Sequence, residues 1–536
     1  MSDLQRALEV ATEAALAAGA LIRKEAYATG GPRGGGHKAD VDDEADVLIR
    51  DRLLAAFPDW SYHGEEIGTH VAADPCTFWL VDPNDGTYSY LEGWRASAVS
   101  IALVRDGVPV LGVVYAPCYP DDSGDLITWA EGCGAICRNG RPLDLEPLPA
   151  ALTSRHVVII SQAAEGRASI NLELVAPARY RALSSIAYRL ALVAAGEGEA
   201  TLSLAGAGWL DFAAGHALLR ARSGEVTDRG GEAVRYPRVG NREIGWICVG
   251  GHPSVCAWLG GRSWKSIIQT PDEPHALGFP TRPRNPRPHV DTRLLSRAQG
   301  VLLGQLAGDA LGSLVEFSPS HTIRRQYPDG PRDLQDGGYW ATVAGQPTDD
   351  SELALALART LVANRGFDET TVFGAYRLWY GSRPFDIGGT TRAAFARNTH
   401  LECGLHASSE SNGALMRVSP LGIAACSGLE RAVEWARRDA GLSHPNPVCR
   451  EANAVFVRAI AAGLAGATRQ EMYRTALEAS TPLTREALER AQVAPPADFM
   501  RSQGWVKTAL QNAFHRLLHA ESLEQGVIDT VREGGD

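Results

Sequence analysis

The sequence lacks the cysteine patterns that mark disulfide-rich or zinc-binding proteins. Its nine cysteines are scattered along 536 residues, and no two of them stand in a CxxC arrangement. The HExxH motif of zinc enzymes is also missing, so we do not expect a zinc ion. An odd number of scattered cysteines favours a reducing, cytoplasmic setting, in which cysteine serves as a small apolar side chain.

Long apolar runs and blocks of basic residues are absent as well. No uncharged apolar segment reaches the length of about 18 residues that a membrane span requires, so we expect no membrane partner. The N-terminal stretch MSDLQRALEVATEAALAAGALIRKEA is typical of an amphipathic helix and not of a signal peptide. The net charge of −11, without a block rich in Lys and Arg, argues against a nucleic-acid partner.

Two patterns divide the chain, which is long enough for two large domains. Residues 1–265 alternate helical and strand-like segments, such as TFWLVD and VPVLGVVYA, which predicts layered α and β elements. Residues 266–292 are rich in proline and have no apolar period, and we expect a linker there. From residue 293 to 536 nearly every segment is typical of a helix.

A glycine-rich stretch, TGGPRGGGHKAD, lies between two predicted helices. The first of these helices should end near Ala28, and the second should span roughly residues 42–56. The stretch lacks the GK[ST] ending of a phosphate-binding loop, so we expect a flexible connector.

The stretch WLVDPNDGTYSY places two aspartates directly after an apolar run. A strand that ends in this way delivers Asp82 and Asp85 to one rim. Pro83 removes a backbone donor and leaves carbonyl groups free, while Gly86 allows the backbone to approach a ligand closely. Thr87 is expected to open a helix, whose free N–H groups can hold an anion. Carboxylate and carbonyl oxygens are the ligands that Mg²⁺ prefers, although an ordinary capped loop has the same local pattern.

Two further acidic segments accompany this turn. Glu65 lies upstream in YHGEEIG, and Asp211 lies downstream in WLDFAAGHALL at a predicted helix start. Each segment is weak evidence alone, because acidic pairs are common on surfaces. The order GEE, DPxDGT and DxAAG resembles that of the inositol monophosphatase family of Mg²⁺-dependent phosphatases, over residues 1 to about 260. In that family Trp and Asp are adjacent in the third motif, whereas Leu210 separates Trp209 from Asp211 here.

This resemblance implies an αβαβα sandwich that holds two or three Mg²⁺ ions and hydrolyses phosphate monoesters. It implies that Glu65 binds the first metal, and that Asp82 bridges the first and second metals. Asp85 and Asp211 would bind the second metal, and the carbonyl group of Pro83 would assist.

The resemblance also implies roles for the groups around the substrate phosphate. Thr87 would position the attacking water together with Glu65, and the amides of Gly86 and Thr87 would hold the phosphate. Asp42 is the best match for the acid that supports the threonine. Asp40 and Asp43 remain alternatives, and a solvated helix start is the ordinary interpretation of all three.

The second half opens with RAQGVLLGQLAGDALGSLVEF, in which glycine recurs every four residues. These glycines are Gly300, Gly304, Gly308 and Gly312. They predict a helical stripe that another backbone can approach closely. Gln305, Asp309 and Glu316 favour a buried helix in a non-membrane domain over a membrane span. Asp309 and Glu316 should point into one cleft, although a helix-end acid and a capping acid would have the same pattern.

Five ordered motifs resemble those of the ADP-ribosylglycohydrolases, from about residue 294 to the end. They are GDALGSLVEF, TDDSELALA, PFDIGGTTRAA, SNGALMRVSPLG and LSHPNPVCREANAV. The resemblance implies an all-helical bundle with up to two Mg²⁺ ions. Such a domain cuts the bond between ADP-ribose and a protein side chain or another group.

The resemblance places metal ligands and cleft residues on this half. The implied metal ligands are Thr348, Asp349, Asp350 and Asp536. Glu316 faces the ribose as an acid/base or gate residue. The cleft is lined by Asn412, Gly413 and Met416, and approached by His444, for which a structural role is the ordinary interpretation. The family continues with a D-T-D-T segment, of which Asp536 is the first acid, so we expect the domain to be incomplete at its C-terminus.

These observations predict a Mg²⁺-dependent phosphomonoesterase fused to an ADP-ribosylglycohydrolase-like domain. The expected substrates are an inositol phosphate or a nucleotide or ribose phosphate, and an ADP-ribosylated group. An alternative is that the second half only binds ADP-ribose or forms dimers, and a third is that neither half is catalytic. The resemblance to the first family suggests a homodimer, and the sequence leaves the oligomeric state open.

Overall fold

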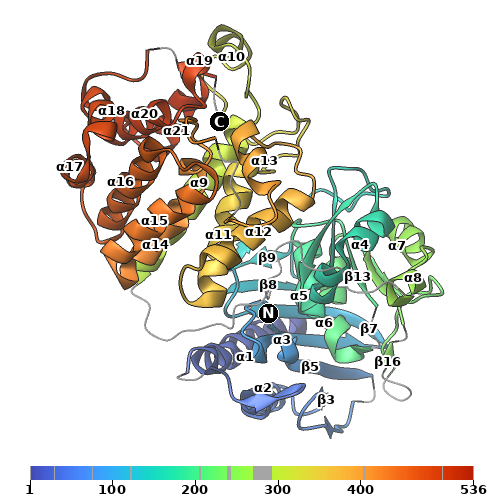
Figure 1. The fold of residues 1–536 in the computed structure, drawn as a ribbon. Helices are drawn as coiled ribbons and strands as arrows, with labels where there is room; N and C mark the ends of the chain where they lie inside the picture. The colour runs from blue at the N-terminus through green and yellow to red at the C-terminus, as the bar shows by residue number, and fades with distance from the viewer. Residues whose placement is uncertain are drawn as a thin grey trace. The chain divides into compact units, whose positions relative to one another are not determined.

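The structure is a computed structural model and is shown in Figure 1. It describes residues 2–28, 31–74, 76–120, 123–204, 207–237, 243–244, 246–269, 292–401, 406–497 and 499–534. The described residues up to 269 belong to one compact unit, and those from 292 onward belong to a second. Most of the predicted linker therefore lies outside the described residues. Its first residues form part of α8 (Lys265–Gln269), because Trp264 and Ile267 are buried in the first unit.

An eight-stranded sheet organises the first unit, with strand order β10-β9-β8-β7-β6-β5-β3-β4. Its longer strands are β3 (Ser61–Gly64), β5 (Thr77–Asp85), β6 (Ala98–Arg105), β7 (Val108–Ala116) and β8 (Asp125–Ala130). The edges are the short strands β4 (Thr69–His70), β9 (Cys137–Arg138) and β10 (Arg141–Pro142). Pairing is antiparallel throughout except between β3 and β5.

Both faces of this sheet are covered by helices, because successive side chains of a strand point to opposite sides. Trp79 and Val81 of β5 pack under α1 (Asp3–Ala26) and α2 (Asp40–Ala56). Phe78 and Leu80 of the same strand pack under α5 (Ile186–Ala194) and α6 (Trp209–Arg220). A strand buried on both faces has the near-continuous apolar sequence seen in TFWLV.

A second sheet lies on the far side of α5 and α6, with order β12-β11-β13-β17-β15 (Figure 1). Its strands are β11 (Val157–Ser161), β12 (Arg179–Leu183), β13 (Ala200–Ser203), β15 (Glu225–Thr227) and β17 (Cys248–Gly251). The outer layer is formed by α4 (Ala168–Val175), α7 (Pro253–Gly260) and α8. The layers follow the order α, β, α, β, α, which confirms the predicted sandwich.

The glycine-rich stretch after α1 differs from the predicted connector. It forms a short hairpin of β1 (Gly34–Gly35) and β2 (Lys38–Ala39), and α2 begins earlier than predicted, at Asp40. The carboxylate of Asp42 accepts a hydrogen bond from the amide of Ala39 at 2.9 Å, which caps the helix. The last residue of the hairpin is therefore tied to the helix that follows it.

The second unit is helical, as predicted, and its described residues include no strand longer than an isolated bridge. Its longer helices are α9 (Thr292–Gly312), α11 (Asp349–Asn364), α12 (Glu369–Gly381), α15 (Leu429–Ser443), α16 (Pro447–Leu464), α17 (Arg469–Ala479), α18 (Pro482–Val493), α20 (Val506–His519) and α21 (Leu523–Val531). The shorter ones are α10 (Ser320–Gln326), α13 (Gly389–Phe395), α14 (Ser419–Ala424) and α19 (Phe499–Ser502).

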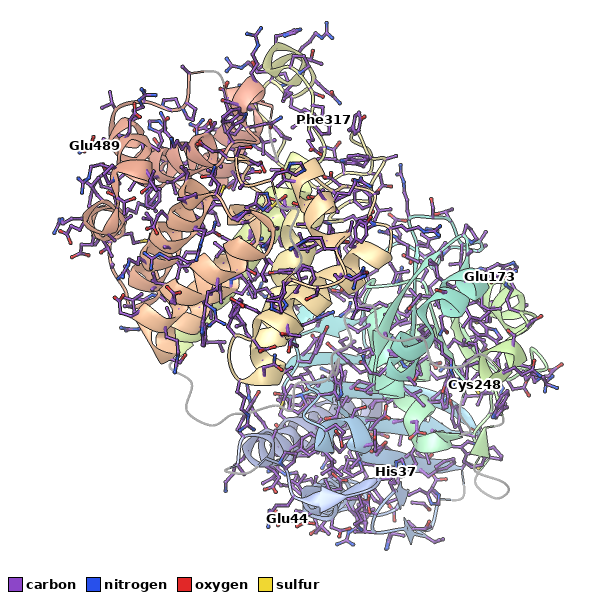
Figure 2. The ribbon with its side chains drawn as sticks, in the orientation of Figure 1. His37, Glu44, Glu173, Cys248, Phe317 and Glu489 are labelled. Carbon is purple, nitrogen blue, oxygen red and sulfur yellow. The ribbon has the colours of Figure 1, made fainter. Side chains whose placement is uncertain are left out.

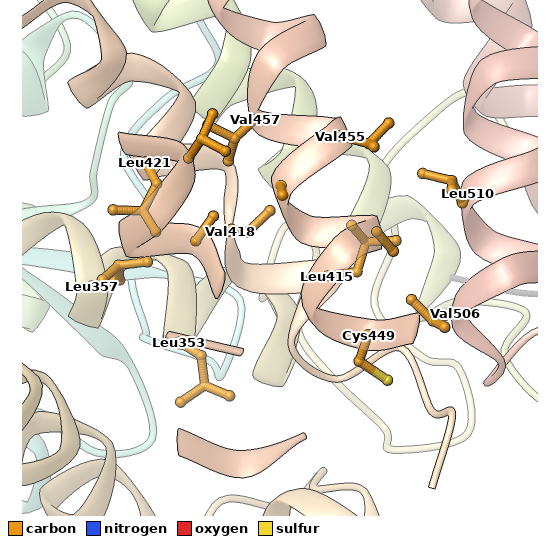
Figure 3. Packing of buried hydrophobic residues seen from close by; sticks show 14 of the residues in the cluster. Leu353, Leu357, Leu415, Val418, Leu421, Cys449, Val455, Val457, Val506 and Leu510 are labelled. Atoms are coloured by element: carbon orange, nitrogen blue, oxygen red, sulfur yellow. The ribbon is translucent and has the colours of Figure 1, made fainter. Parts of the chain in front are cut away.

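Helices α11, α16 and α20 contribute side chains to one apolar core (Figure 3). Leu353 of α11, Val455 of α16 and Leu510 of α20 are all buried in it. Cys449 is buried in the same core, where its thiol occupies the place of a small apolar side chain. Four of the eight described cysteines are buried, as the sequence predicted for an apolar role, and no disulfide joins any two of the eight.

Two predictions for α9 were wrong. A Cβ atom added at Gly300 or Gly308 would meet nothing within 4 Å, and at Gly304 it would meet only Leu523 at 3.6 Å, so no backbone approaches these three glycines closely. The three glycines instead border a cavity. The helix is also only partly buried, with Leu303 63% exposed. No helix among the described residues is long and apolar enough to cross a membrane.

Candidate active sites

Asp82 and Asp85 at the end of β5 and Asp211 in the first turn of α6 form a compact acidic cluster. One carboxylate oxygen from each lies within 4.8 Å of the other two. A bulge explains why two strand residues three positions apart share one face: Asp82 pairs with Ser100 of β6 and Asp85 with Ala98, so β5 holds one extra residue. Without that residue the alternation of the strand would turn the two carboxylates to opposite faces.

Each carboxylate of the cluster is held by main-chain or hydroxyl donors. Oδ2 of Asp85 accepts hydrogen bonds from Oγ of Ser185 and from the amide of Ala187, both at 2.6 Å, at the N-terminus of α5. Oδ2 of Asp211 accepts one from the amide of Gly208 at 2.9 Å. In Asp82, Oδ1 accepts one from the amide of Asn84 at 2.8 Å. These bonds fix the directions in which the carboxylates point.

The electrostatics of the cluster fit a divalent cation. Burial raises the pKa of Asp82 far above its ordinary value, and the charges of Glu65 and Asp85 raise it further. Burial and the neighbouring acids raise the pKa of Asp211 in the same way, and burial raises that of Asp85. Several carboxylates crowded in a low-dielectric interior are costly unless a cation or protons neutralise them. Hard carboxylate oxygens are the donors that Mg²⁺ prefers.

Glu65 lies at the open edge of this cluster, directly after β3. Its side chain is solvent-accessible, and its carboxyl group is hydrogen-bonded to Asp82. Its amide donates to the carbonyl oxygen of Val81 at 3.2 Å, which joins the GEE segment to β5. The structure therefore brings together the four acids that the three motifs contribute.

Sequence reasoning missed Asp46, a buried residue of α2 that supports the GEE segment. Its Oδ2 accepts hydrogen bonds from the amides of Glu66 at 2.9 Å and Ile67 at 3.1 Å, and its Oδ1 accepts one from the hydroxyl of Tyr62. A Cβ atom on Gly64 would lie 2.5 Å from this carboxylate, so only glycine fits there. The sequence did contain a signal for Asp46, because this acid lies on the same face of the helix as the apolar residues.

Thr87, Asp42 and Asn84 form a second polar group next to the acids. Oγ1 of Thr87 lies 3.3 Å from Oδ2 of Asp42 and 2.9 Å from the carbonyl oxygen of Asn84. Nδ2 of Asn84 donates to Oδ1 of Asp42 at 2.9 Å, a contact that sequence reasoning also missed. Asp42 is buried, which raises its pKa to about 6. Asp40 and Asp43, the alternatives to Asp42, are exposed. Asp43 forms an ion pair with the ammonium group of Lys38 at 2.8 Å.

Gly86 and Pro83 occupy the positions that the turn requires. Gly86 has φ 94°, a left-handed conformation that favours glycine, and it precedes α3 (Thr87–Leu91). Pro83 lies within the bulge of β5 between the two aspartates. Trp209 is buried against Tyr236, with ring centroids 6.3 Å apart. Asp211 still falls in the first turn of α6.

The second unit contains a cavity of about 880 Å³. Seven of the predicted residues line it: Glu316, Asp349, Asp350, Asn412, Gly413, Met416 and His444. Asp309 and Asp386 add two more carboxylates, and the former was expected to share the cleft with Glu316. Thr348 is buried beside the cavity, and Asp536 lies outside the described residues. Within the described part of this unit, no three acids come as close together as those of the first unit.

Gln305 of α9 joins the segments that border this cavity. Its Nε2 donates to the carbonyl oxygen of Asp350 at 3.1 Å and to that of Met416 at 2.8 Å. The hydroxyl of Ser419 donates to its Oε1. Glu316 is oriented by the indole N–H of Trp340, which donates to Oε2 at 2.9 Å.

Aromatic side chains lie beside Glu316 at the edge of the cavity. Phe317, labelled in Figure 2, is 49% exposed and has φ 61°. Its ring packs edge-on against Tyr339, with centroids 4.8 Å apart. A bulky residue in this backbone region is strained, so surrounding contacts must hold it there.

His444 is buried and neutral. Its Nε2 lies 2.9 Å from Oγ of Ser411, its Nδ1 lies 2.8 Å from Oγ of Ser443, and burial lowers its pKa to about 3. A Cβ atom on Gly413 would lie 2.9 Å from the imidazole and 2.7 Å from Oγ1 of Thr391. Glycine is therefore required where the cavity wall meets this histidine.

Two family models match the chain, one to each half. The model described as "Inositol monophosphatase family" matches residues 3–252, and the model described as "ADP-ribosylglycohydrolase" matches residues 290–536.

Curated relatives of both kinds are similar to the chain. An ADP-ribosyl-[dinitrogen reductase] glycohydrolase of Rhodospirillum rubrum is 30% identical over 253 residues, which cover 45% of this chain and 80% of the relative. Inositol monophosphatase 3 of Solanum lycopersicum is 33% identical over 248 residues, which cover 43% of this chain and 88% of the relative.

Solved structures match each half as well. An inositol monophosphatase from Anabaena covers 51% of this chain and 98% of its own, with a TM-score of 0.38 and 26% identity. An ADP-ribosylglycohydrolase-related protein complex covers 46% of this chain and 83% of its own, with a TM-score of 0.40 and 28% identity.

Proposed function

Because the N-terminal half of the chain belongs to the inositol monophosphatase family and the C-terminal half to the ADP-ribosylglycohydrolase family, we propose a bifunctional Mg²⁺-dependent hydrolase. Its first activity is the hydrolysis of a phosphate monoester. The observation that carries this proposal is the convergence of Asp82, Asp85 and Asp211 within 4.8 Å. A bound cation stabilises carboxylates at that spacing.

The residues of the first site have distinct roles in this proposal. Asp82, Asp85 and Asp211 hold Mg²⁺ together with Glu65 and the carbonyl group of Pro83. Bound Mg²⁺ supplies positive charge to the phosphate and lowers the pKa of a coordinated water. The amides of Gly86 and Thr87 hold the phosphate oxygens from the start of α3.

The attacking water is oriented by side chains of this chain. The hydroxyl of Thr87 donates to Asp42 or to the carbonyl of Asn84, which leaves its oxygen as the acceptor for a water proton. Glu65 at the open edge of the cluster is the second group that orients this water. The water oxygen bonds to phosphorus as the ester P–O bond breaks, and the proton that the water loses balances the one that the leaving alcohol takes, so no covalent intermediate is required.

We propose that the substrate of the first unit is a phosphorylated nucleotide or ribose fragment instead of an inositol phosphate. The support is the fusion to an ADP-ribosylglycohydrolase domain, since fused enzymes commonly share related substrates. The test is a Mg²⁺-dependent assay of inositol monophosphate, 3′-phosphoadenosine 5′-phosphate and phosphorylated ADP-ribose. A higher kcat/KM for inositol monophosphate would contradict the nucleotide assignment and leave the phosphatase assignment standing.

For the second unit we propose removal of ADP-ribose from a modified side chain in the 880 Å³ cavity. The support is the set of motif residues on the cavity wall, with Glu316 oriented by Trp340 as the acid/base or gate residue. The predicted ligands are Thr348, Asp349, Asp350 and Asp536. Calorimetry with ADP-ribose, alongside release of ADP-ribose from an ADP-ribosyl-arginine substrate, tests this. Binding without turnover would favour the non-catalytic module instead.

A further inference from the structure

His515 and His519 stand one turn apart at the end of α20, in the stretch HRLLH. Residues four apart lie on one face of a helix, so both side chains project to the same side. The centroids of their rings are 4.5 Å apart, and the ring planes are tilted by 38°. His519 is exposed and His515 is half-buried, so solvent and dissolved ions reach the pair.

Each imidazole is tied to the end of α18 by one of its two nitrogen atoms. Nδ1 of His515 lies 2.9 Å from the carbonyl oxygen of Ala491, and Nε2 of His519 lies 3.1 Å from that of Gln492. A carbonyl oxygen only accepts hydrogen bonds, so these two nitrogens carry the protons. In the neutral rings the other nitrogen, Nε2 of His515 and Nδ1 of His519, therefore keeps its lone pair.

These orientations are the ones that metal-binding histidines commonly have. A ligating imidazole usually donates its second N–H to a backbone carbonyl or a carboxylate, which fixes the ring. A zinc ion lies about 2.1 Å from each nitrogen, so two such nitrogens must be about 3–4 Å apart. Rings with centroids 4.5 Å apart are close enough for that spacing. Burial lowers the pKa of His515, and the neighbouring His519 lowers it further, which favours the unprotonated form that a metal requires.

The competing explanation is that the two histidines only cap the C-terminus of α18. The last four carbonyl groups of a helix lack a partner within it, and those of Ala491 and Gln492 are among them. Gln511, one turn before His515, donates its amide Nε2 to the carbonyl oxygen of Ala494 at 3.1 Å. An amide thus caps a neighbouring carbonyl from the same helix, so capping alone does not account for two imidazoles.

We propose that His515 and His519 form a binding site for a divalent transition-metal ion, such as Zn²⁺ or Ni²⁺, on the second unit. Nε2 of His515 and Nδ1 of His519 are the protein ligands, and water completes the coordination. Imidazole suits these ions, whereas Mg²⁺ prefers oxygen ligands, so this site differs in chemistry from the acidic ones.

The proposed ion has a structural role, and the site does not depend on either proposed activity. HRLLH lacks the glutamate that acts as the base in HExxH enzymes. The ion joins two consecutive turns of α20, which also contributes Asn512 and Ala513 to the wall of the cavity. Bound metal should therefore stabilise this helix against local opening.

The test is calorimetric titration of the reduced full chain with Ni²⁺, in excess Mg²⁺ that competes for the carboxylate sites. His515→Asn and His519→Gln remove the ligand nitrogen but keep an amide donor near the bonded position, so the cap of α18 is retained. Each should weaken Ni²⁺ binding at least about tenfold, because loss of even an outer partner of a metal ligand costs that much.

His321→Gln is the matched control. This exposed histidine of α10 has Phe317 and Arg325 four residues away instead of a second histidine. Its substitution should leave Ni²⁺ affinity within about twofold of the wild type, as for an ordinary surface position. Hydrogen exchange followed by mass spectrometry locates the ion, since Ni²⁺ should slow exchange in α20 of the wild type and of His321→Gln only.

The outcomes decide between a metal site and a simple cap. The site predicts equal unfolding temperatures of all chains in EDTA and a rise with Ni²⁺ that His515→Asn and His519→Gln lose. Exchange in α20 that Ni²⁺ does not slow in the wild type would overturn the site. Ni²⁺ affinity that is unchanged in both variants would also overturn it. If His515→Asn does not fold, the exposed His519→Gln decides alone, because a single remaining imidazole does not chelate the ion.

Discussion

The carboxylate of Asp309 accepts hydrogen bonds from both the amide and the hydroxyl of Thr348, at 3.0 and 2.8 Å, although 39 residues separate them. It also accepts one from the amide of Ser351 at 3.0 Å. Thr348 makes no side-chain cap for α11, so a residue of α9 performs that role. This contact sets the direction in which Asp349 and Asp350 enter the cavity.

Replacing Asp309 by alanine should therefore destabilise the second unit. Two buried amides and one hydroxyl lose their acceptor, which costs about 2 kcal/mol. Urea unfolding of the full chain, followed through the second transition, measures this loss. ADP-ribose binding by calorimetry should weaken in parallel, because the start of α11 is released. Unchanged stability would mean that water replaces the carboxylate without cost.

Asp82→Asn and Asp85→Asn should each abolish phosphatase turnover. Each removes a charged ligand from the proposed metal site, and loss of several kcal/mol of transition-state stabilisation lowers kcat by roughly 10³-fold. Chelation of the wild type with EDTA should have the same effect, reversed by added Mg²⁺. Mg²⁺ should also raise the unfolding temperature of the wild type but not that of the variants. Activity retained in either variant would refute the ligand assignment.

Asp42 and Asp43 are adjacent, yet their substitutions should differ. Asp42 contacts Thr87 and Asn84 from a buried position, whereas Asp43 is exposed and pairs with Lys38. Asp42→Asn should lower kcat about 10- to 100-fold, as expected for a group that orients a catalytic partner. The matched control Asp43→Asn should keep kcat within about twofold. Equal effects of the two substitutions would contradict a role for Asp42 through Thr87.

Acid should destabilise the second unit through His444. Its folded pKa is lowered to about 3, whereas an unfolded histidine has a pKa of about 6.5. Between these values the unfolded chain binds a proton that the folded chain does not, so stability is present above pH 6.5 and is lost as the pH falls. The slope from this group is about 1.4 kcal/mol per pH unit. In His444→Gln, urea unfolding at pH 7.5 and 5 should show a smaller pH dependence than in the wild type.

The sequence alone determined the class of each half and the positions of the acids. TFWLVD and VPVLGVVYA predicted β5 and β7 because strand and helix periods are local properties of neighbouring side chains. Asp82 and Asp85 were identified from the turn DPNDG, which has its own backbone requirements, whereas Glu65 and Asp211 were identified through the order of the three motifs. Local patterns could not reveal the partners of Asp46 and Asn84, which lie 20 and 42 residues away along the chain.

Only the tertiary structure decided how these local pieces meet. The bulge in β5 turns Asp82 and Asp85 to one face, and α5 brings Ser185 to Asp85 across 100 residues of sequence. The glycine stripe of α9 shows the converse, since its spacing suggested a close backbone contact and packing placed a cavity beside it. Spacing specifies which side chains share a face, but the group that occupies the space opposite that face depends on long-range packing of the whole unit.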